Sequence, residues 1–295
     1  MVRRPTAVQP PPRPQYLTGL RAAARTGIFI AKVFPMLPSR PLDAVTPRVM
    51  TERLTYSTSH GPAEAELYRP ATRGPHPGVV VCLGVVPFGV DHPQVPRLGK
   101  ALARSGFAAL LYWSPAMRDF RLVPEDSGDI ASAYLRLLQH PAVDPLRSGL
   151  LGACVGGAFA LMAAADDRIR ARVAFVAAYA AFASMWSLSR DIVSGTRQRA
   201  GAREPWAVDP LTRKVFLQSI TSDLDPDEGA WLRQSEHAGD ATDSGPIHSA
   251  DAQAVAQVVK HQTVTEAEAA LRRLPAAMRA RLDAMSPIHY LGSIR

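Results

Sequence analysis

One cysteine lies between a short apolar run and an alanine-rich run, in a stretch crowded with small residues. Residues 148–161 read SGLLGACVGGAFAL, which places Gly152 two positions before Cys154 and Gly156 two positions after it. Small residues at these positions allow a strained turn that lifts the central side chain clear of a sheet. The spacing therefore predicts a strand, a sharp turn and a helix, with the Cys154 thiol at the apex of the turn.

A thiol in such a turn is suited to nucleophilic chemistry. The helix behind it would direct free N–H groups and the positive end of its dipole at the sulfur, which favours the thiolate. The N–H of Val155 would point to where an oxyanion forms when the thiolate attacks a carbonyl carbon. The alternative is a structural role, because a free cysteine is often just a small core residue.

Elements that could position this turn follow one another in a regular order. Strands are expected at 53–56, 65–68, 78–83, 107–113, 149–152 and 172–178, with helices between them at 96–105, 124–139 and 156–165. Continuous apolar strands such as 78–83 fit a sheet that is covered on both faces. Alternating strands and helices predict an α/β fold with a doubly wound, mostly parallel sheet.

The rest of the chain departs from this alternation. Residues 1–16 form a Pro/Arg-rich arm that is expected to be disordered, and residues 17–50 a basic apolar helix and linker. The core is expected over 51–183. Residues 184–285 contain several helical segments and no convincing strand, which predicts a helical lid inserted after the sixth strand. Residues 286–295 would then lead back towards the sheet.

Composition narrows the classes of function. Two cysteines in 295 residues form no disulfide framework, and Cys82 is expected inside a buried strand, so a reducing cytoplasm is the natural compartment. There is no Cys/His metal spacing and no Gly-rich phosphate loop, so neither a metal nor a cofactor is predicted. No apolar run reaches the ~18 residues of a membrane span.

The positive charge is concentrated at one end. Residues 1–54 carry nine basic and two acidic residues, which accounts for +7 of the formal net charge of +8. This charge lies on a proline-rich arm and not on a folded face interleaved with aromatic residues, so nucleic-acid binding is not predicted. The segment 17–37 is expected either to pack on the body or to lie at a membrane surface as an interfacial helix.

Four segments together resemble the α/β-hydrolase superfamily, closest to its dienelactone-hydrolase-like branch. They are PGVVVCLG at 77–84, LARSGF at 102–107, VDPLR at 143–147 leading into the cysteine turn, and AADDRI at 164–169. The resemblance covers 51–180 well and 181–295 loosely. It implies that the turn is a nucleophile elbow with Cys154 as nucleophile. It further implies an oxyanion hole formed by the N–H of Val155 with that of Val85 or Val86.

The same resemblance implies an acid after a seventh strand and a histidine after an eighth strand. The segment SPIHYL at 286–291 is similar to what precedes that seventh strand, so the chain is expected to be truncated before both residues. Histidines within the chain are weak substitutes: His92 follows the third strand beside Asp91, and the others considered are His237, His248, His261 and His289. Without a seventh strand, the sixth would be an exposed apolar edge, which predicts poor solubility.

Three interpretations follow. The first is a hydrolase of small, apolar, ester-like or lactone-like carboxylic substrates. Its catalysis is expected to be impaired, because the acid and the histidine would lie beyond the chain end. The second is a non-catalytic binding protein of the same fold. The third is a membrane-peripheral protein that docks through 17–37, and it is compatible with either of the others. The sequence does not predict an oligomeric state.

Overall fold

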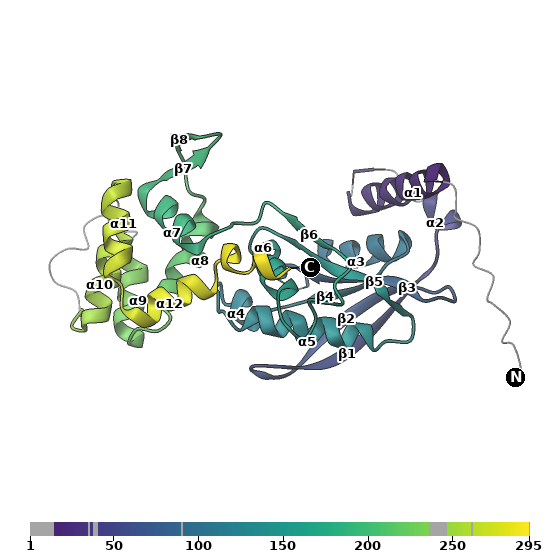
Figure 1. The fold of residues 1–295 in the computed structure, drawn as a ribbon, viewed down its shortest axis with the longest axis horizontal. Coiled ribbons are helices and arrows are strands. Elements are labelled where there is room, and N and C mark those ends of the chain that lie inside the picture. Colours follow the sequence, from purple (N-terminus) through teal and green to yellow (C-terminus); the bar gives the residue numbers. More distant parts are fainter. Residues whose placement is uncertain are drawn as a thin grey trace, which may run out of the picture.

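Two neighbouring parts make up the molecule, a sheet covered by helices and a helical part beside it (Figure 1). The computed structural model describes residues 15–34, 36–37, 41–89, 91–235, 247–260 and 262–294. Residues 1–14 of the arm predicted at 1–16, and His237 and His261, lie outside the described residues. The prediction of disorder is wrong for Gln15 and Tyr16, which form the first residues of helix α1 (Gln15–Val33).

Six strands form the central sheet in the order β1-β2-β4-β3-β5-β6. Their bounds are β1 Val49–Thr58, β2 Gly61–Pro70, β3 His76–Cys82, β4 Ala108–Tyr112, β5 Val143–Ala153 and β6 Val176–Tyr179. The hairpin β1–β2 is antiparallel and pairs antiparallel with β4, whereas β4, β3, β5 and β6 run parallel to one another. The predicted α/β fold with a mostly parallel sheet is therefore confirmed.

Helices cover both faces of this sheet because alternate strand residues point to opposite sides. Val79 and Val81 of β3 pack with α3 (Gln94–Arg104) on one face, whereas Val80 and Cys82 pack with α5 (Asp126–Leu138) and α6 (Val155–Ala164) on the other. Since both sets are buried, β3 reads as one continuous apolar run.

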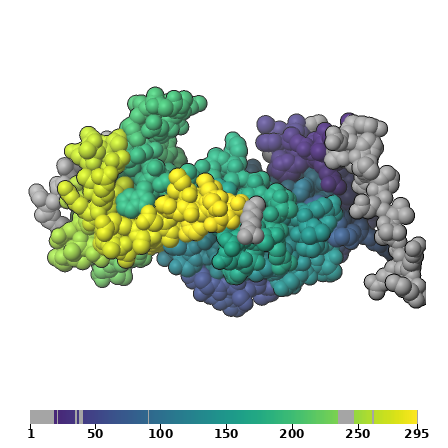
Figure 2. All heavy atoms as spheres, in the orientation of Figure 1, coloured from purple at the N-terminus to yellow at the C-terminus, as the bar shows by residue number. Residues whose placement is uncertain are grey.

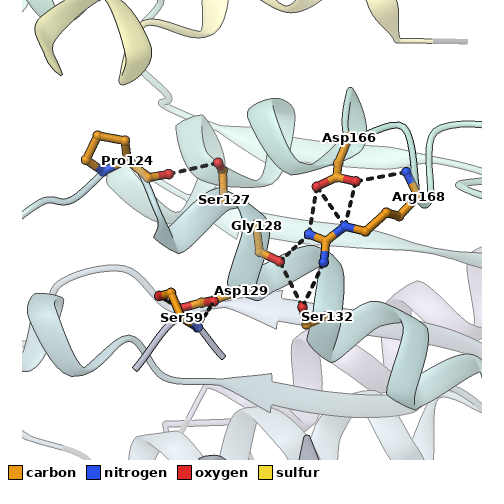
Figure 3. A network of polar contacts seen from close by, with 8 residues as sticks. All are labelled: Ser59, Pro124, Ser127, Gly128, Asp129, Ser132, Asp166 and Arg168. Carbon is orange, nitrogen blue, oxygen red and sulfur yellow. Dashed lines mark hydrogen bonds and ion pairs between the residues drawn. The ribbon is translucent and has the colours of Figure 1, made fainter. Parts of the chain in front are cut away.

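A polar network ties α5 to the loop that follows α6 (Figure 3). The Arg168 guanidinium pairs with Asp166 at 2.7 Å and donates to the carbonyl oxygen of Gly128 (2.7 Å) and to the Ser132 hydroxyl (3.1 Å). On the same helix, the Asp129 carboxylate accepts from the Ser59 N–H at 2.7 Å. These contacts fix α5 against the β1–β2 turn and against the end of α6, which leads away from the cysteine turn.

The helical part contains one feature that the sequence did not suggest. Its elements are α7 Met185–Ser194, β7 Thr196–Arg199, β8 Ala202–Pro205, α8 Pro210–Ile220, α9 Pro226–Ser235, α10 Ala250–Val259, α11 Val264–Arg273 and α12 Ala276–Ala284. The expectation of no strand in 184–285 is wrong, because β7 and β8 form an antiparallel hairpin. Its strands are polar and mostly exposed, so they lack the apolar alternation by which a strand is recognised.

The two ends of the helical part lie side by side. The Ser286 hydroxyl accepts from the Met185 N–H at 2.9 Å, and the Ile288 N–H donates to the Ala183 carbonyl oxygen at 2.9 Å. After this junction the chain forms two short 3-10 helices, η2 Pro287–His289 and η3 Leu291–Ser293. In Figure 2 this C-terminal stretch, in yellow, runs across the surface from the helical part to the sheet part.

The N-terminal helix α1 (Gln15–Val33) packs on the sheet part beside α3 (Figure 1), with Phe29 against the core on that face. A short helix, α2 (Leu42–Val45), follows and is tied to α1 by an ion pair of 2.7 Å between Lys32 and Asp43. Among the described helices, none has the length and apolar character needed to cross a bilayer.

The edge strand β6 differs from the prediction in position and in burial. It begins at Val176 and not at 172, because residues 167–172 still form turns, in which the Arg172 N–H donates to the Ile169 carbonyl oxygen. Phe175 and Tyr179 remain 37% and 78% exposed. In the described part of the chain, one side of β6 therefore presents an unpaired strand edge.

Candidate active site

Cys154 occupies the single residue between β5 and α6. Its backbone has φ 51° and ψ −124°, a conformation that costs a non-glycine residue about 1–3 kcal/mol. The Cys154 N–H donates to the Tyr179 carbonyl oxygen at 2.8 Å, and the Cys154 carbonyl oxygen accepts from Ala158 at 3.2 Å. The ends of β6 and of α6 thus hold the turn in place on both sides.

The flanking glycines have a direct steric explanation. A Cβ atom on Gly156 would lie 2.0 Å from the carbonyl oxygen of Cys82, at the end of β3. A Cβ atom on Gly152 would lie 2.4 Å from the Gly156 backbone. The helix and the two strands approach too closely for any side chain at either position, and this proximity brings the thiol to the carboxyl end of the sheet.

The two cysteines of the chain lie in opposite environments. Cys82 is 2% exposed within β3, and burial raises the pKa of its thiol. Cys154 is exposed, and it lies at the N-terminus of α6. Of the two thiols, that of Cys154 is therefore the one a small molecule can reach.

Backbone donors lie close to this thiol. No hydrogen-bond acceptor for the N–H of Val155 or Val85 is found among the described residues. The loop that carries Val85 is held close to the turn, since a Cβ on Gly84 (φ +69°) would lie 2.8 Å from the Gly156 nitrogen. Val85 lines the cavity described below and Val86 does not, so Val85 is the better placed of the two predicted partners of Val155.

A cavity of about 300 Å³ opens above Cys154, between the carboxyl end of the sheet and the helical part. Its volume is at the lower end of the range of small-molecule sites, about 300–1,000 Å³. The lining side chains are almost all apolar: Leu83, Val85, Leu122, Ala153, Val155, Ala180, Ala181, Phe182, Met185, Leu188, Ile192, Trp206, Leu211, Val215 and Phe216, with Cys154 and Thr212.

No histidine, aspartate or glutamate lines this cavity in the described ranges. His92 instead packs against Phe88, with ring centroids 4.0 Å apart and the ring planes tilted by 41°, and accepts from the Gln94 N–H. His289 lies 3.7 Å from Asp283 on the outside of α12, and His248 precedes α10. The structure therefore does not bring these three candidate histidines to Cys154. The described residues also contain no metal-binding group of three or more His, Cys, Asp or Glu.

The helical part contributes residues that the sequence analysis missed. Helix α8 begins at an Asp209 N-cap followed by Pro210, and Leu211 and Val215 then face the cavity one turn apart. Trp206 follows the β7–β8 hairpin. The backbone N–H of Trp206 donates to the Gly195 carbonyl oxygen at 2.7 Å, which joins the two ends of the hairpin. The apolar four-residue spacing in α8 was a usable signal, whereas nothing local identifies Trp206.

Leu122 connects the two walls of the cavity. Its N–H donates to the Ser219 hydroxyl of α8 at 3.0 Å, and its carbonyl oxygen accepts from the Arg281 guanidinium of α12 at 2.8 Å. Arg281 also donates to Ser222 (2.7 Å) and pairs with Asp223 (2.6 Å). One backbone unit of the sheet part therefore fixes the position of the helical wall.

Comparison with known proteins finds one curated protein that is similar in sequence over part of the chain, and several solved structures with low sequence identity. No family model matches the chain. Over 129 residues it is 36% identical to a probable 2-oxo-3-(5-oxofuran-2-ylidene)propanoate lactonase of Bradyrhizobium sp., a match that covers 38% of this chain and 50% of that protein. The matched region thus spans about half the length of this curated relative.

Among the solved structures that are similar to the chain are two hydrolases. A 2,6-dihydroxy-pseudo-oxynicotine hydrolase is 16% identical, with a TM-score of 0.47 over 83% of this chain and 50% of that one. A putative dienelactone hydrolase from Klebsiella pneumoniae is 20% identical, with a TM-score of 0.34 over 41% of this chain and 56% of that one.

Proposed function

Because the chain is similar over 129 residues to a probable lactonase, we propose that it cleaves ester-like or lactone-like carboxylic substrates through Cys154. The main support for this proposal is the exposed thiol of Cys154, a residue with positive φ. It lies at the N-terminus of α6, beside a cavity large enough for a small molecule. The unpaired N–H groups of Val155 and Val85 support an oxyanion hole at the same point.

The reaction we propose proceeds in two steps. The Cys154 proton passes to water, the thiolate attacks the carbonyl carbon, and the resulting oxyanion accepts from the Val155 and Val85 N–H groups. Collapse of this intermediate breaks the C–O bond and expels the alkoxide, which takes a proton from water. Water then adds to the thioester and releases the carboxylic acid and the free thiol.

The second step is expected to be slow. No imidazole among the described residues lines the cavity to activate water, and loss of the base from a catalytic triad costs on the order of 10⁶ in turnover. A cysteine is intrinsically nucleophilic, so the first step is less dependent on a base. We therefore expect a burst of about one acyl group per chain, followed by slow turnover.

Burst kinetics with p-nitrophenyl acetate test this proposal. Release of p-nitrophenolate should match one added acetyl group, located on Cys154 by peptide mass spectrometry. Cys154→Ala should abolish the burst. Cys82 is the internal control, because its buried thiol should react only in denaturant. An unmodified Cys154 after prolonged incubation would instead favour a non-catalytic binding protein of the same fold.

A second role, compatible with the first, is peripheral contact with a membrane through α1. The observation that favours it is the exposure of Leu20 (66%) and Ile30 (44%) on the helix and of Phe34 (54%) just after it. Co-sedimentation with anionic vesicles, compared between the full chain and a variant without residues 1–40, would test this contact. Equal sedimentation of the two proteins would exclude it.

A further inference from the structure

The cavity above Cys154 has no charged side chain among the described residues that line it. None of its lining residues is Lys, Arg, His, Asp or Glu, and besides Cys154 only Thr212 and Trp206 carry a side-chain O–H or N–H group. The Thr212 hydroxyl donates to the Asp209 carboxylate at 2.6 Å, so its proton is already committed to the helix N-cap. A substrate in this cavity therefore meets apolar side chains and the backbone donors near the thiol.

Cations lie close by but are held away from this space. Arg213 and Lys214 follow Thr212 on α8 and line a separate groove on the other side of that helix. The Lys214 ammonium lies over the Phe120 ring, 3.5 Å from its centroid. Arg281 is directed to Leu122 and to the turn that contains Asp223. The helix periodicity thus places Leu211 and Val215 in the cavity and the charges outside it.

We infer that the site selects an uncharged, apolar acyl group and rejects a substrate that carries a free carboxylate on its acyl chain. This inference rests on the proposed function, because it names the substrate class of the same thiol. It also separates this chain from its curated relative, whose name specifies a propanoate, a carboxylate anion.

The physical reason is the cost of desolvating an unpaired ion. A carboxylate that leaves water for an apolar cavity loses its hydration and gains no cation from the lining side chains. The Trp206 indole N–H is a single neutral donor and cannot replace that hydration. The N-terminus of α6, which favours negative charge, lies at Cys154, where the reacting carbonyl must bind. A methylene chain has no such cost and gains from burial against Trp206 and Phe216.

Two acyl donors with the same leaving group and the same chain length provide the decisive comparison. They are p-nitrophenyl hexanoate and the mono-p-nitrophenyl ester of adipic acid, which differ only in the terminal carboxylate. The second-order rate constant for acylation of Cys154 should be at least ~100-fold larger for the hexanoate. Rate constants within threefold of each other, or a faster reaction with the adipate, would overturn the inference.

p-Nitrophenyl acetate separates a failure of the inference from a failure of the proposed function. The acetyl group is too short to fill the cavity, so its transfer reports only on the thiol. If acetate does not acylate Cys154, the proposed function fails. If acetate reacts but hexanoate shows no preference over adipate, the proposed function stands and the substrate class is wrong.

A variant with a charge in the cavity tests the same point from the protein side. Leu211 lines the cavity, is only partly buried and lies near the beginning of α8. Leu211→Arg should lower the hexanoate-to-adipate ratio at least tenfold, and Leu211→Met is the control for a change of shape without charge. An unchanged ratio in folded Leu211→Arg protein would contradict the inference. If this variant does not fold, the wild-type comparison alone decides.

Discussion

The floor and the roof of the cavity are built by different means. The floor is backbone: a strained cysteine, glycines that admit no Cβ, and the N–H groups of Val155 and Val85. The roof is side chain: apolar residues on α7 and α8, with Trp206 after the hairpin. Substitutions in the floor should therefore affect the reaction itself, whereas substitutions in the roof should affect which acyl group reacts.

The largest effect is expected from Gly156→Ala in the floor. The new Cβ would lie 2.0 Å from the Cys82 carbonyl oxygen, so α6 or β3 must shift. A displacement of this size should slow acylation of Cys154 by p-nitrophenyl acetate at least ~100-fold. It should also lower the free energy of unfolding by about 1–3 kcal/mol.

The matched control is Gly128→Ala in α5, where the nearest atom to the new Cβ lies at 3.5 Å. This change should leave acylation unaltered and add a few tenths to about 1 kcal/mol of stability, because alanine has the higher helix propensity. Equal acylation rates in both variants would show that the floor tolerates backbone movement, and the comparison would lose its basis.

Arg281→Met tests the joint between floor and roof. The substitution removes the donor to the Leu122 carbonyl oxygen and the contacts to Ser222 and Asp223. Charge-assisted hydrogen bonds are individually worth about 1.5–3 kcal/mol, so unfolding in urea should show a loss of about 3 kcal/mol. The ratio of the acylation rate constants for hexanoate and acetate should also fall, because the helical roof is no longer fixed in position over Cys154.

Arg279→Met on the same helix is the control. The Arg279 side chain is exposed and donates to the Arg272 carbonyl oxygen at the surface, so its removal should change stability by less than about 0.5 kcal/mol. If the two variants behave alike, Arg281 does not connect the walls.

The free energy of unfolding is expected to depend on pH through Asp126, a buried carboxyl group at the start of α5 that does not line the cavity. Burial raises the pKa of Asp126 to about 6, although the Ser114 and Tyr112 hydroxyls partly oppose this by donating to its carboxylate. Because the folded state raises this pKa, the stabilising contribution is complete below the unfolded pKa, near 4, and is lost as pH rises through 6. The free energy of unfolding should therefore fall by about 2 kcal/mol between pH 4.5 and 7 from this group alone.

Asp126→Asn should remove that component of the pH dependence, measured by urea unfolding at a series of pH values. Asp126 does not line the cavity, so the preference between hexanoate and adipate should be unaltered at pH 7. An identical pH profile in the two proteins would contradict the assignment to Asp126.

The smallest effect concerns the outer edge of the floor. Because one side of β6 has no partner strand among the described residues and Tyr179 is exposed, we expect poor solubility and association that increases with concentration. Ala177→Lys, which adds a charge at this edge, should raise the soluble concentration, and Ala23→Lys on the exposed face of α1 is the control. A monodisperse monomer of the unmodified chain at high concentration would refute the expectation.

The floor could be predicted from the sequence because it obeys short-range rules. The spacing of Gly152 and Gly156 around Cys154 is a steric requirement of a turn between a strand and a helix, and the run at 78–83 indicates a strand buried on both faces. Each of these signals lies within a few residues of the feature that it predicts.

The roof could not be predicted in the same way. Leu122 meets Ser219 and Arg281 across 97 and 159 positions of sequence, and no local pattern specifies such pairings. The β7–β8 hairpin that precedes Trp206 is polar on both faces, so its strands resemble a loop in sequence. The position of a base, predicted by resemblance alone, is still a prediction.

The hydrogen bond between Met185 and Ser286 brings together the two ends of the helical part that forms the roof, so this part could be exchanged as one insertion. These residues are 101 positions apart in sequence, yet a hydrogen bond of 2.9 Å joins them. The chain therefore leaves the sheet part and returns to it at one point, so a stretch of any length whose own ends meet could take the place of the helices without moving either flank. New selectivity could then be acquired by recombination at this one point, with the thiol and its backbone donors left as they are.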